Sequence, residues 1–385
     1  MTNITFSQIR QEQKRKILIE IAIAVGAIII LSLILPLILS PFRLQLLGRF
    51  LALTIVALGI DLIWGYTGLL SLGHGIFFAL GGYGIAMYLK LQLPDGQLPE
   101  FFTLYGVSEL PWFWKPFYSF PFTVVAIFVI PAIVAGILGY LVFRNRIKGV
   151  YFSIITQAAL IVFFNFFNGQ QKLINGTNGL KTDTETIFGV VASSQTAQFA
   201  FYQFTILFLL LAYLLCRWLT SGRFGRLLIA IRDDENRVRF SGYNPTGFKV
   251  LVFAVSGAIA GVSGALYTLQ TGIITPSIME VAFSIEMVIW VAVGGRGTLL
   301  GAIIGTLLVR FGQTFLSEEF PEIWLFFQGA LFLMVVTVLP DGIVGWWNNW
   351  AWLKLKSVLG LQPKLTTYPA IEQNPEVEME KENIG

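Results

Sequence analysis

RFGRLLIAIRDDENRVRFSGYNPTGFK, residues 223–249, is a strongly charged island between two segments apolar enough to cross a bilayer, 199–219 and 250–269. A membrane protein that only had to return its chain would need a short polar turn at this point. Residues 223–249 instead have the length and composition to form helices at the membrane surface. We therefore expect a soluble partner to dock on this island.

The island divides naturally into two helices. Residues 225–231 are rich in apolar side chains and would continue along the membrane surface. Asp233 or Asp234 is a suitable N-cap for a second, short helix, which would end at Gly242 as C′ residue, with Pro245 preventing continuation. A basic anchor on anionic lipid headgroups would explain the arginines, but not three consecutive acids with a cap and a stop.

The rest of the chain is too apolar for one water-soluble core. Of its 385 residues, 55% are hydrophobic and only 12% are charged, whereas an average soluble domain is about a quarter charged. We therefore predict an all-α, polytopic membrane protein. The single Cys and single His exclude a disulfide framework and any metal site built from several His or Cys ligands.

Apolar segments of roughly 20 residues, the length that crosses a bilayer, recur about ten times. They are 17–39, 49–64, 69–89, 120–143, 150–167, 199–219, 250–269, 281–293, 299–315 and 323–346. The second and the eighth are short, and the eighth contains Glu286. Either of these two could therefore be tilted or broken.

Lys and Arg collect on the cytoplasmic side of membrane proteins. With the basic residues 1–16 inside, alternation places the island inside as well, and the long loops 90–119 and 168–198 outside. Arg43 and Arg49 fall outside and count against this scheme. The predicted organisation is a cytoplasmic basic N-terminus (1–16), a transmembrane domain (17–346) that contains the loop 220–249, and a cytoplasmic, partly disordered acidic tail (347–385).

Small residues recur at four-residue spacing, which lets helices approach closely in lipid. Gly257 and Gly261 share one face of 250–269, and Gly297, Gly301 and Gly305 form two successive steps at 297–305. We predict close helix packing at these positions. Direct contact with a solute is the alternative.

The segment AIRDDENRVRFSGYNPTGFK (230–249) resembles the cytoplasmic coupling loop of permeases in ATP-driven (ABC) importers of the branched-chain amino acid class. Other motifs resemble the same family in the same order: GYTGLLSLGHGIFFALGGYGIAMYL (65–89), TNGL (177–180), SGAIAGVSGALY (256–267) and VAVGGRGTLLGAIIGTLL (291–308). The resemblance covers about residues 46–346. It implies that the loop contacts the ATPase through Arg232, Asp233, Asp234, Glu235 and Gly242, with Glu235 and Gly242 at the family's acid and glycine. Arg237 and Val238 depart from the family's small-residue pattern.

Within this class the chain looks most like the longer membrane subunit of urea-type permeases. The stretches behind this narrower resemblance are 48–70, ELPWFW (109–114), 275–299 and FPEIWLFFQGALF (320–332). The implied solute is urea or a related short amide. Branched-chain amino acids are the alternative.

A neutral, hydrogen-bonding solute needs hydroxyl and amide partners along its path. The candidates for the translocation path are the polar side chains of span 150–167: Ser153, Thr156, Gln157 and Asn165. Each can equally bond to its own helix or to a neighbour.

Two charged residues fall near one cytoplasmic layer. Asp61 lies near the inner end of the second span and Arg296 near that of the eighth. Because charges in lipid tend to pair or to face a cavity, these two could form a gate or a structural pair. The sequence is equally consistent with each of the two side chains contacting the membrane interface separately.

The chain contains no G-x-x-x-x-G-K-[ST] phosphate loop. The resemblance therefore implies a transport subunit rather than an enzyme, working by alternating access in a bacterial inner membrane. Its implied partners are a second, related permease subunit, two ATP-binding subunits, a periplasmic solute-binding protein and membrane lipid, with no cofactor and no nucleic acid. A self-sufficient secondary transporter or channel is the rival, with Glu286 as its mid-membrane coupling residue.

Overall fold

The computed structural model describes residues 26–93, 97–320 and 342–347, with a few further positions between 323 and 337. Its contacts divide the chain into two units, Met1–Val344 and Gly345–Gly385. The helices discussed below belong to the first unit, and of the second only residues 345–347 are described. The predicted N-terminal segment 1–16, most of the last span (323–346) and nearly all of the acidic tail (347–385) lie outside the described residues.

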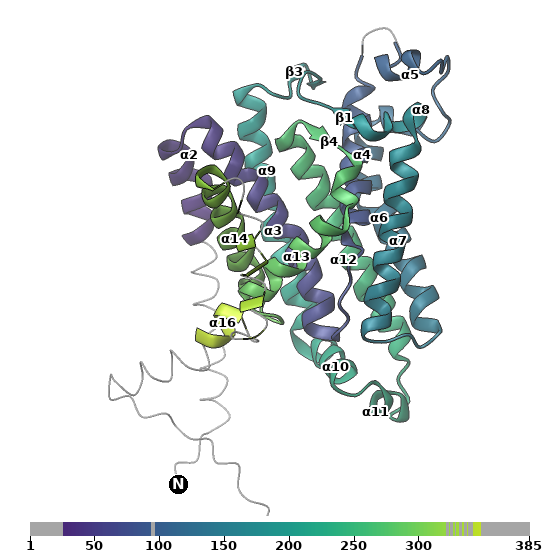
Figure 1. The fold of residues 1–385 in the computed structure, drawn as a ribbon, viewed down its shortest axis with the longest axis vertical. Coiled ribbons are helices and arrows are strands. Elements are labelled where there is room, and N and C mark those ends of the chain that lie inside the picture. The colour runs from purple at the N-terminus through teal and green to yellow at the C-terminus, as the bar shows by residue number, and fades with distance from the viewer. Residues whose placement is uncertain are drawn as a thin grey trace, which may run out of the picture. The chain divides into compact units, whose positions relative to one another are not determined.

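Within the described part of the chain, six helices are long and apolar enough to cross a membrane (Figure 1). They are α3 (Pro41–Thr67), α6 (Phe120–Arg144), α7 (Val150–Gly169), α9 (Gln195–Thr220), α12 (Pro245–Thr271) and α14 (Leu299–Glu319). The predicted helical class is thereby confirmed. Of the roughly ten predicted spans, these six have the necessary length in the described residues.

Two predicted spans form helices shorter than the roughly 20 residues that usually cross a bilayer. At 1.5 Å per residue, the 17 residues of α4 (His74–Lys90) and the 14 of α13 (Val281–Gly294) cover about 26 and 21 Å, against a hydrocarbon thickness of about 30 Å. The predicted span 69–89 is shortened because α3 ends at Gly68, whose φ of 74° is left-handed, and residues 68–73 are not helical. The first predicted span is described only as the short helix Gly26–Ile38.

The helix α12 forms the centre of the bundle and packs against α3, α4 and α6 (Figure 1). Glycines of α12 allow its backbone to lie against the backbones of α4 and α6. A Cβ at Gly264 would collide with the carbonyl oxygen of Phe78 in α4, and a Cβ at Gly257 or Gly261 would collide with α6 around Pro131. The four-residue spacing of Gly257 and Gly261 thus lies at a close helix contact.

The hairpin of α13 and α14 is also packed through glycines, but not through all three that the spacing suggested. Gly301 and Gly305 of α14 lie against α13 at Gly294. Gly297 does not lie on a helix, since α14 begins at Leu299 and Gly297 sits in the preceding turn with a left-handed φ of 78°. Gly297 and Gly301 therefore do not share a helix face, because Gly297 precedes the helix that contains Gly301.

The two ends of the bundle carry different elements (Figure 1). The charged island forms α10 (Gly222–Asp233) and α11 (Glu235–Phe240) at one end. The opposite end carries α5 (Glu100–Leu104), α8 (Gln171–Ile174) and four two-residue strands, β1 (Leu180–Lys181), β2 (Thr186–Ile187), β3 (Val190–Val191) and β4 (Ile273–Ile274). β1 pairs antiparallel with β4, and β2 with β3. The loops 90–119 and 168–198 therefore lie at the end away from the island, as their predicted topology requires.

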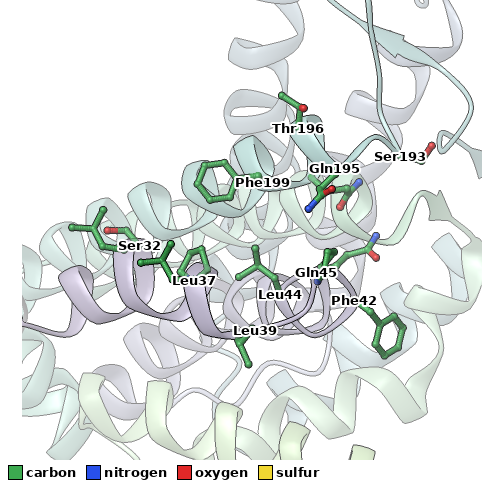
Figure 2. Close-up of a pocket in the computed structure, with 14 residues that line it drawn as sticks. Ser32, Leu37, Leu39, Phe42, Leu44, Gln45, Ser193, Gln195, Thr196 and Phe199 are labelled. Carbon is green, nitrogen blue, oxygen red and sulfur yellow. The ribbon is translucent and has the colours of Figure 1, made fainter.

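A cavity of about 880 Å³ lies between the start of α9 and the segment that joins α2 (Leu35–Ile38) to α3. Figure 2 shows Phe199 and Gln195 of α9 facing Leu44 and Gln45 across it. The polar side chain of Gln45 is used in packing, because its amide donates to the carbonyl of Gln270 at 2.8 Å. We therefore assign this mostly apolar cavity no role in solute binding.

Candidate functional site

Side-chain caps divide the charged island into α10 and α11. Asp234 is the N-cap of α11, since its carboxylate accepts hydrogen bonds from the backbone N–H groups of Asn236 (3.0 Å) and Arg237 (3.2 Å). The helix ends as Gly242 adopts a left-handed φ of 86° and donates to the carbonyl of Arg239. Pro245 does not simply end this region, because it is the first residue of α12.

Glu235 lies in a nearly buried ion cluster. One carboxylate oxygen accepts a hydrogen bond from Arg239 at 2.7 Å, and the other lies 3.2 Å from the ammonium groups of both Lys148 and Lys249. The Glu235 side chain is 7% exposed and that of Lys249 only 1%. Lys249 also lies over the ring of Phe143, at 4.8 Å from its centroid. The cluster therefore joins α11 to α12 and to the turn between α6 and α7.

The family resemblance implies that Glu235 contacts the ATPase. Within this chain its carboxylate is already engaged by Arg239, Lys148 and Lys249. Burial alone would raise the pKa of Glu235, but the hydrogen bond from Arg239 and the charges of Lys249 and Lys148 outweigh it and hold that pKa below its ordinary value. Glu235 is therefore a carboxylate at neutral pH and fixes the position of α11.

The outward surface of this region is aromatic. Phe240, the last residue of α11, is 91% exposed, and Tyr243 is also exposed. Leu227, Val238 and Tyr243 contribute to a groove of about 380 Å³ between α10 and α11. The sequence interpretation concentrated on charge and missed Phe240 and Tyr243. A signal for them was present, because both are large aromatic residues within an otherwise polar loop.

Arg232 connects α10 to the end of α3. Its guanidinium donates to the carbonyl of Gly65 at 2.9 Å and to the carboxylate of Asp233 at 3.1 Å. One turn before Gly65, the fully buried Asp61 accepts a hydrogen bond from the backbone N–H of Gly297 at 2.6 Å. The end of α3 thus contacts both the island and the turn between α13 and α14.

The suggested gate or structural pair of Asp61 and Arg296 makes no ion pair within 4 Å, although the charge of Arg296 acts on the Asp61 carboxylate. Asp61 bonds instead to the backbone of the next residue, Gly297, whereas the exposed Arg296 lies 5.7 Å from the ring centroid of Trp64. The physical reason is burial, since a buried carboxylate takes a fixed N–H donor while an arginine at the surface keeps its charge in water.

We expect Asp61→Ala to lower the free energy of unfolding by about 1–3 kcal/mol, because the buried N–H of Gly297 would lose its acceptor. Arg296→Gln should change it by no more than about 0.5 kcal/mol, as is usual for surface substitutions. Asp61→Asn is the matched control, since an amide oxygen can still accept the bond. Thermal unfolding of the purified protein in detergent measures all three. Equal losses in Asp61→Ala and Arg296→Gln would contradict this assignment.

The four candidates for the translocation path have different surroundings. Ser153 donates to the carbonyl of Leu70 at 2.7 Å, and the hydroxyl of Thr156 accepts from the N–H of Leu72 at 3.1 Å. These two side chains hold the non-helical segment between α3 and α4 against α7. The amide of Asn165 bonds back to its own helix at Ile161, 2.9 Å away.

Gln157 is half-buried and makes no hydrogen bond to another described residue. Among the four candidates, Gln157 is therefore the one whose side chain has no hydrogen-bond partner in the described part of the chain. Glu286 of α13, the acid within a predicted span, forms an ion pair with Arg310 of α14 at 3.4 Å. Among the described residues, no group of three or more His, Cys, Asp or Glu side chains could hold a metal ion.

Comparison with known proteins points to one family. Residues 42–336 match the family described as the permease component of the branched-chain amino acid transport system. The chain is similar to the high-affinity branched-chain amino acid transport system permease protein LivM of Salmonella typhimurium, with 26% identity over 340 residues, 83% of this chain and 73% of the relative.

Two further relatives agree with this match. The probable branched-chain amino acid transport permease protein LivM of Methanocaldococcus jannaschii is 24% identical over 318 residues, 75% of this chain and 89% of the relative. The high-affinity branched-chain amino acid transport system permease protein LivH of Salmonella typhimurium is 24% identical over 305 residues, 76% of this chain and 90% of the relative. No solved structure matches the chain.

Proposed function

This chain belongs to the family of permease components of branched-chain amino acid transport systems, and from this premise we propose that it is a membrane subunit of an ATP-driven importer whose solute is a branched-chain amino acid. The family match is the observation that carries the proposal. The island of α10 and α11 supports it, because a permease without a phosphate loop needs a surface on which a separate ATPase acts.

A branched-chain amino acid replaces urea as the proposed solute. The sequence alone favoured urea, on the basis of residues in the loops and in the last predicted helices. The relatives from Salmonella typhimurium and Methanocaldococcus jannaschii are named for branched-chain amino acid transport. These names support the amino acid, and the narrower resemblance to urea-type permeases has no comparable support.

In the proposed mechanism, closure of two ATPase subunits moves α11, and the helix bundle then opens alternately to either side. The partner covers the aromatic surface of Phe240 and Tyr243. Movement of α11 is passed to α12 through Glu235 and Lys249, and movement of α10 is passed to α3 through Arg232. Because α12 packs against α3, α4 and α6, a shift of this helix repositions the core of the bundle.

The proposed setting follows from the same role. The chain would be a multi-pass protein of a bacterial inner membrane, with cytoplasmic termini and the domain 17–346 as its transport unit. It would assemble with a second, related permease subunit and two ATP-binding subunits, and a periplasmic solute-binding protein would deliver solute to the end that carries α5 and β1. ATP hydrolysis would belong to the partner subunits, so this chain is proposed to be no enzyme.

The assembled transporter, reconstituted in proteoliposomes with its binding protein, should take up radiolabelled leucine in an ATP-dependent manner. Unlabelled valine and isoleucine should compete, and urea at the same concentration should not. ATP-dependent uptake of urea without leucine would instead support the urea-type reading. Leucine uptake by this chain alone, without ATP or ATPase subunits, would establish a secondary transporter or channel and overturn the proposal.

A further inference from the structure

A pocket of about 520 Å³ is lined by residues of the α4 end, α5 and β1. Figure 1 shows α5 and β1 at the end of the bundle opposite α10 and α11. One wall comes from the loop after α4 and from the start of α5, and includes Leu93 and Phe101. The other wall comes from residues 175–185. The loops 90–119 and 168–198, predicted to form the outer mouth, therefore meet around one cavity.

The second wall is fixed to the central helix. Leu180 of β1 pairs with Ile274 of β4, and the N–H of Thr182 donates to the carbonyl of Gly272, the C-cap of α12, at 2.7 Å. The side-chain amide of Asn175 closes the preceding turn by donating to the carbonyl of Gly179 at 2.8 Å. A change in this pocket is therefore mechanically linked to α12, the helix that also contacts the island through Lys249.

The pocket contains equal numbers of positive and negative side chains. Lys90, at the end of α4, forms an ion pair with Glu185 at 2.6 Å, and their side chains are only 20% and 14% exposed. Lys181 and Glu100 also line the pocket and are exposed. Formally the four charges cancel, so the pocket favours neither an anion nor a cation.

This arrangement suits a molecule that carries both charges itself. A ligand with one charge could enter between Lys90 and Glu185 only by leaving a largely shielded charge without a counter-ion, which is costly. Neutral urea could bond to both side chains, but it would replace the ion pair with weaker contacts that carry no opposite charge. An α-amino acid supplies an ammonium and a carboxylate on one carbon atom. Its two groups can therefore replace the Lys90–Glu185 pair with two new charge-assisted hydrogen bonds.

Part of the remaining lining is apolar and can contact an aliphatic side chain, with Leu93 and Phe101 beside the ion pair. Asn175, Asn178 and Thr184 make another part of the lining polar. Apolar walls with a few placed polar groups are the usual composition of small-molecule sites.

We propose that the pocket lined by Lys90, Glu185 and Phe101 is a receiving site for a zwitterionic amino acid with an aliphatic side chain. The ligand's carboxylate binds Lys90, its ammonium binds Glu185, and its side chain lies against Leu93 and Phe101. Binding opens the Lys90–Glu185 pair and so separates the end of α4 from the segment that is fixed to α12. This inference rests on the proposed function and names the place where the solute first meets this subunit.

A diazirine analogue of leucine, photoactivated on the assembled transporter in nanodiscs without its binding protein, tests the proposal. Mass spectrometry should find adducts on the peptides that contain Leu93 or Phe101. Leucine should prevent the labelling, whereas isopentylamine and 4-methylpentanoate, which each carry one of its two charges, should not. Lys90→Met and Glu185→Gln should each reduce the labelling by at least about tenfold, the effect of losing one charge-assisted bond.

Lys172→Met is the matched control, because Lys172 is an exposed lysine of α8 that does not line the pocket. If either single variant fails to fold in a thermal unfolding assay, the double variant K90M/E185M, which leaves neither charge unpaired, takes its place and should also lose the labelling. Labelling that persists in these variants, or that the singly charged analogues prevent equally well, would overturn the site. If the variants capture the binding protein more weakly but are labelled as strongly as the wild type, these residues form a protein contact. That result would also overturn the proposed site.

Leucine uptake by the same wild-type preparation separates this inference from the proposed function. Uptake without adducts in the pocket would overturn the receiving site and leave the proposed function standing. An intact, ATP-hydrolysing transporter that takes up no leucine would overturn both.

Discussion

Replacing Glu235 with Gln should lower the free energy of unfolding of the permease by about 3 kcal/mol, the cost of leaving a buried charge without its partner. Lys249 would be that charge, because its side chain is 1% exposed and its ammonium lies 3.2 Å from the Glu235 carboxylate. Lys148 and Arg239, the other two cations of the cluster, reach water and can turn toward it. Thermal unfolding in detergent and ATP-driven leucine uptake should both show the loss.

The double variant E235Q/K249M should recover most of that stability. Met fills nearly the volume of Lys, and no charge then remains buried. Rescue of this kind separates two roles for Glu235. If its carboxylate bound the ATPase directly, E235Q would weaken ATPase association without changing permease stability, and K249M would rescue nothing.

An exposed ion pair of the same helix provides the control. Arg237 and Asp234 are 3.1 Å apart, but the Arg237 side chain lies almost wholly in water. Arg237→Gln should therefore change the free energy of unfolding by less than about 0.5 kcal/mol. A loss as large as that of E235Q would show that charge number, and not the buried cluster, decides the stability of α11.

The pH dependence of stability has a definite sign. The cations hold the folded-state pKa of Glu235 below the value of about 4.3 that an unperturbed Glu side chain has. A lowered carboxyl pKa stabilises the fold above the unfolded pKa, and that contribution is lost as the pH falls through the folded pKa. The cluster is therefore intact at neutral pH, and E235Q/K249M should remove its share of the destabilisation in acid.

The sequence predicts those parts of this fold that depend on local signals. Apolar segments of spanning length locate the six long helices, and the Asp234 cap and Gly242 lie at the ends of α11. The four-residue spacing of Gly257 and Gly261 lies at the contact of α12 with α6. Each of these features depends on a sequence window of fewer than about 30 residues, which is the range over which helix periodicity and capping act.

Features that depend on contacts between distant segments could not be predicted in this way. Glu235 and Lys249 are only 14 residues apart, but nothing in their spacing says that the carboxylate turns inward. The bond from Gly297 to Asp61 joins positions 236 residues apart, and it required a turn where a continuous small-residue face was expected. The ion pair of Lys90 and Glu185 could not be predicted, because a lysine and a glutamate in two polar loops are ordinary until the fold brings them together.

Gly264→Ala should be among the most damaging single-methyl changes in the bundle. A Cβ at Gly264 would collide with the carbonyl oxygen of Phe78, and both atoms belong to the backbones of packed helices, α12 and α4. No side-chain rotation can relieve that overlap, so the helices must separate and lose contacts along their length. We expect a loss of about 3 kcal/mol, the upper part of the range for overpacked cores, together with loss of leucine uptake.

The same substitution elsewhere in α12 isolates the cause. Gly247 lies in the first turn of α12 and has no atom within 4 Å of an added Cβ. Since Ala is a better helix former than Gly by up to about 1 kcal/mol, Gly247→Ala should be neutral or stabilising. Opposite signs for two Gly→Ala changes in one helix would place the close α4–α12 contact at Gly264. Equal, small effects at both positions would contradict that contact and show that α12 and α4 stand further apart, because only a wider separation leaves room for the methyl group.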